Sequence, residues 1–480
     1  MKSNSISTKE ISEEIENLNQ SFEKELDAFS NIISLISKKD LDEKKKEKNI
    51  PKSSRKQELI LSAEILIEKI EHKGFAICKD IGIIFFFNGK YWEELQQEQL
   101  KKTLRIVSLN LGIDEFNAKC YRYLEDSYKQ FLSAVDIHPP VVNNFSTIIN
   151  FNNGTYVFDT NNKNITGQLK NFNSLDFCKY CLPFDFNPEA KAPIFNQYLD
   201  QVLPDLEVQN VLAEYIAYLF ARNLKLEKVL ILQGFGANGK SVFFDIIHHL
   251  LGIQNVSNFS LNSITDSKGY YRAKLKNVLL NYCSEISKKF NVEVFKQLVS
   301  GEPVGAKALF KDPVIIYKYA KLIFNCNEFP ISKEFNHAFY RRFLIIPFNK
   351  TIPPEKQDKL LSKKIIENEL PGVFNWVLEG SKRLHENKRF SHSDIITNAL
   401  TDYQSNSDNV LIFLKERNYE KSNNKWILIK TLFEEYHSFC IEDNYKSLSK
   451  QNFKKRLESQ NFSITRKTHG NSIELEKIIK

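Results

Sequence analysis

The chain has 480 residues, 42% of them hydrophobic and 26% charged, and its formal net charge is +8. This length predicts two to four domains. No apolar run approaches the length of a bilayer span and no signal peptide begins the chain, so we expect neither a membrane protein nor a secreted one. The seven scattered cysteines, an odd number, are typical of a reduced, cytoplasmic protein.

Residues 1–55 are predicted to form a charged helix and a linker. Apolar residues spaced by three and four positions form a heptad-like stripe from Ile11 to Ile36. Such a helix could form a short coiled coil, dock on a partner or pack on its own domain. The charged run 38–48 that follows is typical of a linker.

Residues 56–190 are predicted to form a mixed α+β domain with helical parts. We expect a helix at 59–70, a hairpin whose strands 83–87 and 90–92 turn at Asn88-Gly89, and two helices at 96–112 and 113–134. Short strands and turns fill residues 148–186. Cys178 and Cys181 form a C-x-x-C pair, but no second pair or nearby histidine completes a zinc site, so we interpret them as structural.

A phosphate-binding loop is predicted after two helices at 194–203 and 208–221. The apolar run 229–232 predicts a buried strand, and Gly234-Phe-Gly-Ala-Asn-Gly-Lys-Ser241 then fits the pattern G-x-x-x-x-G-K-[ST] ahead of an amphipathic helix. Glycines let backbone N–H groups turn toward phosphate oxygens, and the helix N-terminus favours an anion. The residues expected to bind ATP are Gly234, Gly236, Ala237, Asn238, Gly239, Lys240, Ser241 and Val242. Lys240 should reach the β- and γ-phosphates, and Ser241 should ligate Mg²⁺.

Three further buried strands, at 277–284, 319–326 and 343–348, are predicted after the loop. Helices separate them, so residues 191–400 should form an α/β domain with a parallel sheet, helices on both faces and a ligand at the carboxyl edge. A loop and hairpin at 301–317 carries Lys307 and Lys311.

Polar residues end these strands in positions that suit ATP hydrolysis. Glu285 could bind Mg²⁺ through a water and accept a proton, and Asn327 could position the attacking water. Arg341 and Arg342 lie where they would reach the site of a neighbouring subunit, with Arg342 preferred because it directly precedes the last strand. Arginine fingers acting in trans imply a ring with ATP between subunits.

Residues 401–480 are predicted to form a winged helix, with three helices followed by a hairpin. Nine Lys or Arg and three Asp or Glu lie between Lys446 and Lys480, a surplus of six positive charges that favours a polyanion partner. A helix capped by Ser449 presents Lys450, Lys454 and Lys455, and Arg466 and Lys467 belong to a wing turning at Gly470-Asn471. This module suits duplex DNA, although a winged helix can also serve protein contacts.

Four segments resemble superfamily 3 AAA+ helicases of the poxvirus and phage/plasmid primase-helicase type. They are Gly234 to Ser241, the strand ending Ser284-Glu285, Lys321-Leu-Ile-Phe-Asn-Cys-Asn-Glu-Phe-Pro330 and Tyr340-Arg-Arg-Phe-Leu-Ile-Ile-Pro-Phe348. The segment Leu182-Pro-Phe-Asp-Phe-Asn-Pro-Glu-Ala-Lys191 resembles the domain that precedes the motor in this family. The likeness covers about residues 80–480. It departs at Ser284, where many relatives have a second acid, and no primase domain is recognisable.

The resemblance implies an AAA+ P-loop NTPase core that assembles into a homo-hexameric ring. The ring would move along single-stranded DNA that passes through its central channel, where Lys307 and Lys311 would bind the DNA. We therefore expect an ATP- and Mg²⁺-dependent helicase that acts on forked DNA in phage, satellite or plasmid replication, in a bacterial cytoplasm, with a separate primase or replication initiator as a possible partner. The alternatives are an ATP-driven origin-binding or loader protein and a nucleic-acid-sensing defence ATPase, because the same motor would serve each.

Overall fold

The computed structural model describes residues 32–50, 53–80, 83–135, 137–142, 146–159, 167–287, 289–307, 312–329, 337–443, 445 and 447–478. The chain divides into two compact units. The first contains the residues up to Ala190 with two short later segments, 220–223 and 250–252, and the second contains the rest. Among the described residues, no helix combines the length and hydropathy that crossing a bilayer requires.

The first unit begins with helices that pack on its own core. Helix α2 (Lys38–Glu47) lies where we predicted a linker, and that prediction is wrong. Ser37 and Asp40 form a capping box, Leu41 is buried, and ion pairs join α2 to α3 (Arg55–His72), among them Lys44 with Glu68 at 2.5 Å. The charged run at 38–48 therefore belongs to a helix on the surface of this unit, not to a linker.

Only the end of the predicted apolar stripe lies within the described residues. Ile33 and Ile36 are buried in the same hydrophobic cluster as Leu41, Leu66 and Phe131, so this part packs on its own domain. The stripe before residue 32 lies outside the described residues.

Two details of the first unit differ from the prediction. The hairpin strands are β2 (Ile83–Phe87) and β3 (Trp92–Glu94), which follow β1 (Ala76–Asp80), and Phe87 pairs with Trp92. The reverse turn therefore centres on Gly89, whose φ is +96°, and Lys90. The predicted helix at 113–134 is divided into two helices, because the backbone of Cys120 is extended and the second helix begins after it. The helices are α4 (Gln97–Asn110), α5 (Glu115–Lys119) and α6 (Tyr121–Ala134).

An antiparallel sheet of β4 (Ser146–Phe151), β5 (Gly154–Asp159) and β6 (Gly167–Lys170) completes the first unit, as short strands were predicted there. Cys178 and Cys181 follow the 3-10 turn η1 (Ser174–Asp176). Both are buried and reduced, and the Cys178 thiol donates to the Tyr180 carbonyl oxygen at 3.4 Å. This burial agrees with a structural role.

The second unit is built around a five-stranded parallel sheet in the order β13-β7-β12-β9-β8. The four predicted strands are confirmed, and the two-residue edge strand β8 was not predicted. The strands are β7 (Val229–Gln233), β8 (Val256–Ser257), β9 (Leu280–Cys283), β12 (Lys321–Cys326) and β13 (Phe343–Pro347). Their almost continuous apolar runs are typical of a sheet covered on both faces.

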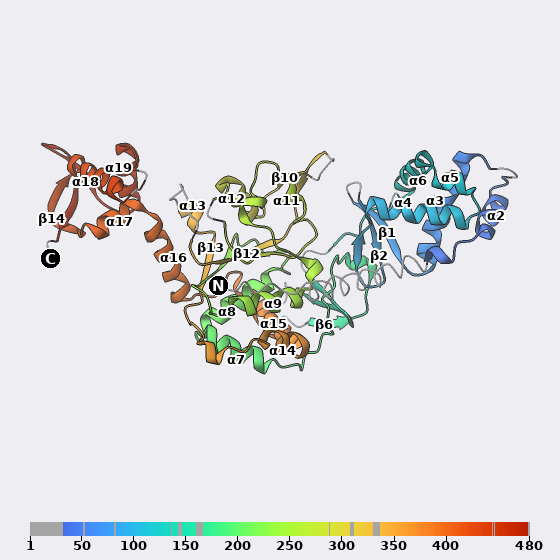
Figure 1. Cartoon of the computed structure of the whole chain (residues 1–480), viewed down its shortest axis with the longest axis horizontal. Helices are drawn as coiled ribbons and strands as arrows, with labels where there is room; N and C mark the ends of the chain where they lie inside the picture. Colours follow the sequence, from blue (N-terminus) through green and yellow to red (C-terminus); the bar gives the residue numbers. More distant parts are fainter. Residues whose placement is uncertain are drawn as a thin grey trace. The chain divides into compact units, whose positions relative to one another are not determined.

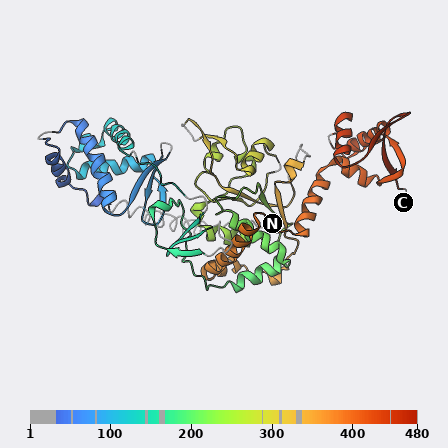
Figure 2. The ribbon, with the colours of Figure 1, turned by 180° about the vertical axis from the view of Figure 1, so that it is seen from behind.

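Helices cover both faces of this sheet, as predicted. Val229 and Ile231 pack with Phe295, Leu298 and Tyr403 in one cluster, while Leu230 and Leu232, which point the other way, are also fully buried. Figure 1 shows α8, α9 and α15 on one side of the sheet and α12 on the other, and Figure 2 gives the view from behind. The larger helices are α7 (Pro193–Val202), α8 (Leu206–Tyr218), α9 (Lys240–Leu251), α12 (Val292–Ser300), α14 (Leu361–Asn368), α15 (Leu370–Asn387) and α16 (Asp394–Ser407).

Shorter elements lie between the strands of the sheet and after the last of them. The predicted hairpin is β10 (Val304–Lys307) paired antiparallel with β11 (Pro313–Ile316). The remaining short helices are α10 (Leu261–Ile264), α11 (Tyr270–Ala273), α13 (His337–Tyr340) and the 3-10 turns η2 (Ile253–Asn255) and η3 (Pro354–Lys356).

The C-terminal module has its own core and an antiparallel sheet in the order β14-β16-β15. The three predicted helices are α17 (Asn409–Glu416), α18 (Ile429–Glu442) and α19 (Lys450–Ser459), and the hairpin is β15 (Ile464–Lys467) with β16 (Gly470–Lys477). Strand β14 (Tyr419–Leu428) was missed, because its centre is polar and its pairing with β16 is interrupted between Lys421 and Trp426. The predicted turn at Gly470-Asn471 is also wrong: Lys467 pairs with Gly470, so the turn residues are Thr468 and His469.

Candidate functional site

The predicted phosphate loop, residues 234–241, lies at the carboxyl edge of the sheet, between β7 and the first turn of α9. The backbone enters it through Gly234, whose N–H donates to the Cys326 carbonyl at 2.9 Å. Left-handed φ angles at Gly236, Ala237 and Gly239 turn successive peptide groups around the loop. The chain passes from β7 toward β8 in one direction and from β12 to β13 in the other, so the loop stands where the strand order reverses. Open parallel sheets bind ligands at such a point.

Lys240 lies inside the loop. It is only 7% exposed, and its ammonium donates to the Gly234 carbonyl at 2.6 Å and to Asn238 Oδ1 at 3.3 Å. Burial lowers the pKa of Lys240, because the charged form loses solvation there. A buried ammonium held by neutral oxygens is suited to receive an anion, so the arrangement fits a phosphate group.

Close packing leaves no room for larger residues at two loop glycines. A Cβ on Gly234 would lie 1.9 Å from Asn238 Nδ2 and 2.7 Å from the Phe348 carbonyl oxygen. A Cβ on Gly239 would lie 2.7 Å from Val202 Cγ1, and Gly239 also has a φ of +86°. The Tyr198 hydroxyl donates to the Gly239 carbonyl at 2.9 Å, so helix α7 supports the loop from behind.

Glu285 and Asn327 lie at the same edge as the loop. Glu285 follows β9, Asn327 follows β12, and both side chains are exposed. The two strands are neighbours in parallel register, with Cys283 beside Phe324, and Cys326 lies beside Gln233 of β7. The backbone N–H of Ile286 donates to the Asn325 carbonyl at 2.9 Å, which ties the segment after β9 to β12.

Ser241 is exposed at the first turn of α9, while Val242 is half-buried. Among the described residues, no group of three or more His, Cys, Asp or Glu is arranged to hold a metal ion. His248 is buried, and its Nε2 accepts from the side-chain amide nitrogen of Asn258 at 2.7 Å, which agrees with the structural role we expected from its position on α9.

The two arginines lie at the opposite edge of the sheet. Strands β7 and β13 pair from Val229 with Phe343 to Gln233 with Pro347, so Arg342 precedes the paired region and Gly234 follows it. Five strand residues separate these edges by roughly 16 Å. This exceeds the length of an arginine side chain, so neither arginine reaches the phosphate loop of its own chain.

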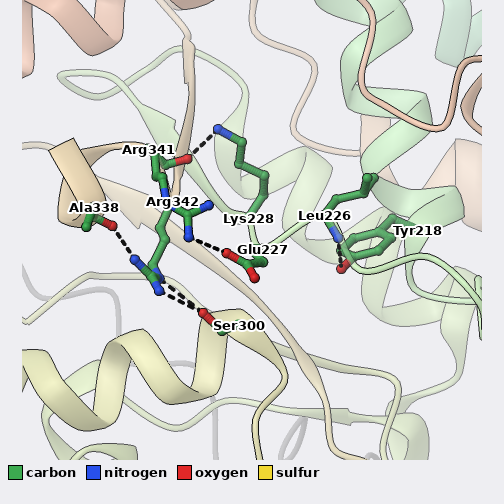
Figure 3. A network of polar contacts seen from close by, with 8 residues as sticks. All are labelled: Tyr218, Leu226, Glu227, Lys228, Ser300, Ala338, Arg341 and Arg342. Carbon is green, nitrogen blue, oxygen red and sulfur yellow. Dashed lines mark hydrogen bonds and ion pairs between the residues drawn. The ribbon is translucent and has the colours of Figure 1, made fainter.

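Arg341 and Arg342 differ in exposure, and Figure 3 shows both with their partners. Arg342 is 8% exposed, with Nη2 and Nε 2.9 and 3.3 Å from Ser300 Oγ and Nη1 bonded to the Ala338 carbonyl. Burial lowers the pKa of Arg342. Arg341 is exposed and pairs with Glu227 at 2.6 Å, while its carbonyl accepts from Lys228 Nζ. Our preference for Arg342 as the finger therefore finds no support in this arrangement, because its guanidinium is turned inward.

The predicted DNA-binding hairpin is anchored at its base by an arginine that the sequence did not reveal. Arg272 is 6% exposed, and its Nε donates to the Gly305 carbonyl at 2.8 Å while Nη1 donates to the Asp266 carbonyl at 2.6 Å. Lys307 is half-buried at the end of β10, and Lys311 lies outside the described residues.

The basic residues predicted in the C-terminal module lie on two elements. Lys450 and Lys455 are exposed on α19 and Lys454 is half-buried there, while Arg466 and Lys467 are exposed on β15. Ser449 caps α19 by accepting from the Asn452 N–H at 3.3 Å, as predicted. Lys450 and Lys454 line a cleft with Lys430 of α18 and with His469, neither of which was predicted. Lysine and histidine on separate helices and turns leave no local pattern, so sequence spacing could not group them.

Two family models match separate parts of the chain. A family described as "D5 N terminal like" matches residues 63–204, and a family of unknown function, DUF5906, matches residues 232–342, from the end of β7 to Arg342. The "Putative helicase L207/L206" of Acanthamoeba polyphaga mimivirus is 24% identical over 183 residues, which cover 35% of this chain and 18% of that protein. The similarity thus spans less than a fifth of that relative.

Two solved structures resemble the fold. Both are apo structures of the NrS-1 C-terminal region, each 14% identical to this chain. One has a TM-score of 0.49 and covers 86% of this chain and 99% of its own, and the other has a TM-score of 0.47 and covers 85% and 98%.

Proposed function

We propose that this protein is an ATP-dependent DNA helicase that works as a ring in replication. The observation that carries the proposal is the edge of the sheet at which a buried lysine in a glycine loop is followed, on neighbouring strands, by Glu285 and Asn327. A viral relative named as a helicase supports the same activity. The structure itself shows an α/β protein with a five-stranded parallel sheet, which agrees with such a core.

In this proposal each residue of the loop edge has one role. Lys240 leaves the Gly234 carbonyl to bind the β- and γ-phosphates of ATP, and loop N–H groups from Gly236 to Val242 surround the phosphates. Ser241 and Glu285 would hold Mg²⁺, which would offset charge on the phosphates. Glu285 accepts a proton from the attacking water, which the Asn327 amide orients.

The arginine edge completes the site of a neighbouring subunit in this proposal. Since Arg341 and Arg342 lie about one strand length from their own loop, they can contribute only across an interface. Arg341 is our candidate for the finger because its guanidinium is exposed, and Arg342 would then hold the segment before β13 against Ser300. A closed ring, hexameric by family resemblance, brings every arginine edge to a loop edge.

DNA contacts are assigned to two regions. Lys307 and Lys311 on the β10–β11 hairpin would grip single-stranded DNA in the channel without reading its sequence. The C-terminal module would be a winged helix whose Lys450, Lys454, Lys455, Arg466 and Lys467 contact duplex DNA at a fork. A separate primase or initiator would then complete the replication machinery.

Strand displacement on forked DNA tests the proposal. Wild type, Lys240→Ala and the control Lys363→Ala, which changes an exposed lysine of α14, are compared with ATP and Mg²⁺, and the same samples are imaged for rings. We expect ATP-dependent unwinding by wild type and Lys363→Ala and none by Lys240→Ala. Rings that hydrolyse ATP and bind DNA without unwinding would instead favour the loader or sensor function.

A further inference from the structure

A cleft of about 450 Å³ lies in the C-terminal module between the start of α18, the helix α19 and the turn that joins β15 to β16. Its lining residues come from all three elements: Leu428, Ile429, Lys430, Lys450, Gln451, Lys454, His469, Gly470 and Asn471. A volume of this order accommodates a ligand of the size of a nucleotide.

The cleft is positively charged. Lys430, Lys450 and Lys454 contribute ammonium groups, and none of the described residues that line it carries a carboxylate. Lys430 and Lys450 are exposed and have no ion-pair partner within the described part of the chain, whereas Lys454 has only a long contact of 3.6 Å with the exposed Glu458. Lysines that converge from two helices without neutralisation favour an anionic ligand.

The start of α18 adds to this preference. The residue before the helix is Leu428, which offers no side-chain cap, and the first turn holds no acidic residue. The first N–H groups of α18 therefore lack a side-chain acceptor at the wall of a cleft that also holds lysines. Leu428 and Ile429 give the same wall an apolar part.

The positive surface extends beyond the cleft along the hairpin. Arg466 is exposed on β15, and Lys467 Nζ lies 3.4 Å from the ring centroid of Trp426. An extended row of charges fits a repeating polyanion better than a single small ion. A nucleic-acid backbone also offers a sugar for the apolar wall, which an acidic peptide lacks.

We propose that this cleft binds one nucleotide unit of a duplex DNA backbone, with the phosphate on Lys430, Lys450 and Lys454 and the deoxyribose against Leu428 and Ile429. The inference rests on the proposed DNA-binding function and adds Lys430 as a contact. It predicts that the cleft anchors the module by phosphate contact and not by reading bases.

Titration of the full chain with a labelled DNA duplex at several salt concentrations, without nucleotide, tests the inference. The logarithm of the affinity for B-DNA falls with log salt by about 0.9 for each phosphate contact. Lys430→Ala and Lys450→Ala should each reduce this slope by part of the value for one phosphate, the double variant should reduce it by about 0.9, and the melting temperature should stay unchanged. Asn471→Asp, which places a charge at the cleft with little change of shape, should weaken binding to every duplex sequence alike.

A matched control separates the cleft from general charge. Lys425→Ala removes a lysine of β14 that pairs with Glu476 at 2.9 Å and does not line the cleft, so its slope should equal that of wild type. Wild-type slopes in Lys430→Ala and Lys450→Ala would overturn the inference. So would competition by polyglutamate as strong as that by DNA of equal charge, because a peptide would then be the better ligand. Since no ATP is present, the result is independent of whether the chain unwinds DNA.

Discussion

Replacing each of the two adjacent arginines separately should give two different defects. In Arg342→Ala, the buried Ser300 hydroxyl loses its donor, whereas the carbonyl of the exposed Ala338 can bond to water instead. A buried polar group left unsatisfied costs about 1–3 kcal/mol, so we expect a loss of this size in the free energy of unfolding. At about 2–4 °C for each kcal/mol, the melting temperature should fall by roughly 2–12 °C.

Arg341→Ala should behave in the opposite way. Its ion pair with Glu227 leaves the arginine side chain 44% exposed, and exposed pairs contribute only about 0.2–1 kcal/mol, so melting should change little. An arginine finger contributes about 10³-fold or more to kcat, so hydrolysis should be nearly abolished while ATP binding persists. The assay combines thermal melting, titration with a fluorescent ATP analogue and ATPase rates.

Mixing two inactive variants tests whether Arg341 acts in trans. Arg341→Ala keeps its phosphate loop and Lys240→Ala keeps its finger, so in rings assembled randomly from equal amounts roughly a quarter of the interfaces combine one intact half from each. ATPase activity should therefore reappear on mixing. Two results would refute the assignment of Arg341 as a finger acting in trans. One is that mixed rings fail to hydrolyse ATP. The other is that a stable Arg342→Ala variant loses hydrolysis while Arg341→Ala stays active.

Further predictions concern the loop, the arginine edge and pH. Tyr198→Phe removes the hydroxyl that donates to Gly239, a hydrogen bond of about 0.5–1.5 kcal/mol, and should raise KM for ATP about two- to tenfold in steady-state assays with little change of kcat. Gly239→Ala should abolish binding of the fluorescent ATP analogue, because the new Cβ collides with helix α7 and the φ is left-handed. Glu227→Gln frees Arg341 from an ion pair of up to about 1 kcal/mol, so ATPase at limiting protein concentration should rise by up to about fivefold, and an unchanged rate would contradict a restraining role. Burial lowers the pKa of His385, so the unfolded chain takes up a proton first as pH falls through about 6.5; stability should fall below that pH, and fall less in His385→Asn, as measured by melting at pH 7.5 and pH 5.

The parallel sheet could be predicted because its strands are buried on both faces. Such strands are short apolar runs, and each of the four predicted runs ended at a residue of different character, such as Gly234 or Asn327. Strand β14 was missed for the opposite reason, since its middle residues Ser422 to Lys425 are polar. Helix α2 was taken for a linker because its charges dominate its composition, yet a single buried Leu41 and ion pairs to α3 suffice to hold it.

The residues expected to act at the site could be selected from their place after strands, but their supports could not. The contact between Tyr198 and Gly239 joins positions 41 residues apart, and the bond between Arg342 and Ser300 joins positions 42 apart. The sequence around Tyr198 and around Arg342 gives no indication of these partners. The same limit explains the choice between Arg341 and Arg342, because adjacent residues at the end of a helix point in different directions and only the packing of Ser300 decides which one is buried.

The separation of the two sheet edges has a consequence for how nucleotide could affect assembly. Strand β7 begins next to Glu227 and Lys228, which hold Arg341, and ends at Gly234, which holds Lys240. Both ends are tied to the same partner strand, since the Val229 N–H donates to the Arg342 carbonyl and the Phe348 N–H donates to the Gln233 carbonyl. If Lys240 moves to a phosphate as proposed, the rearranged loop would act on the strand pair that also carries the arginine edge. In the proposed ring that edge would face the next subunit, so the order in which neighbouring sites hydrolyse ATP would depend on β7 and β13 moving together.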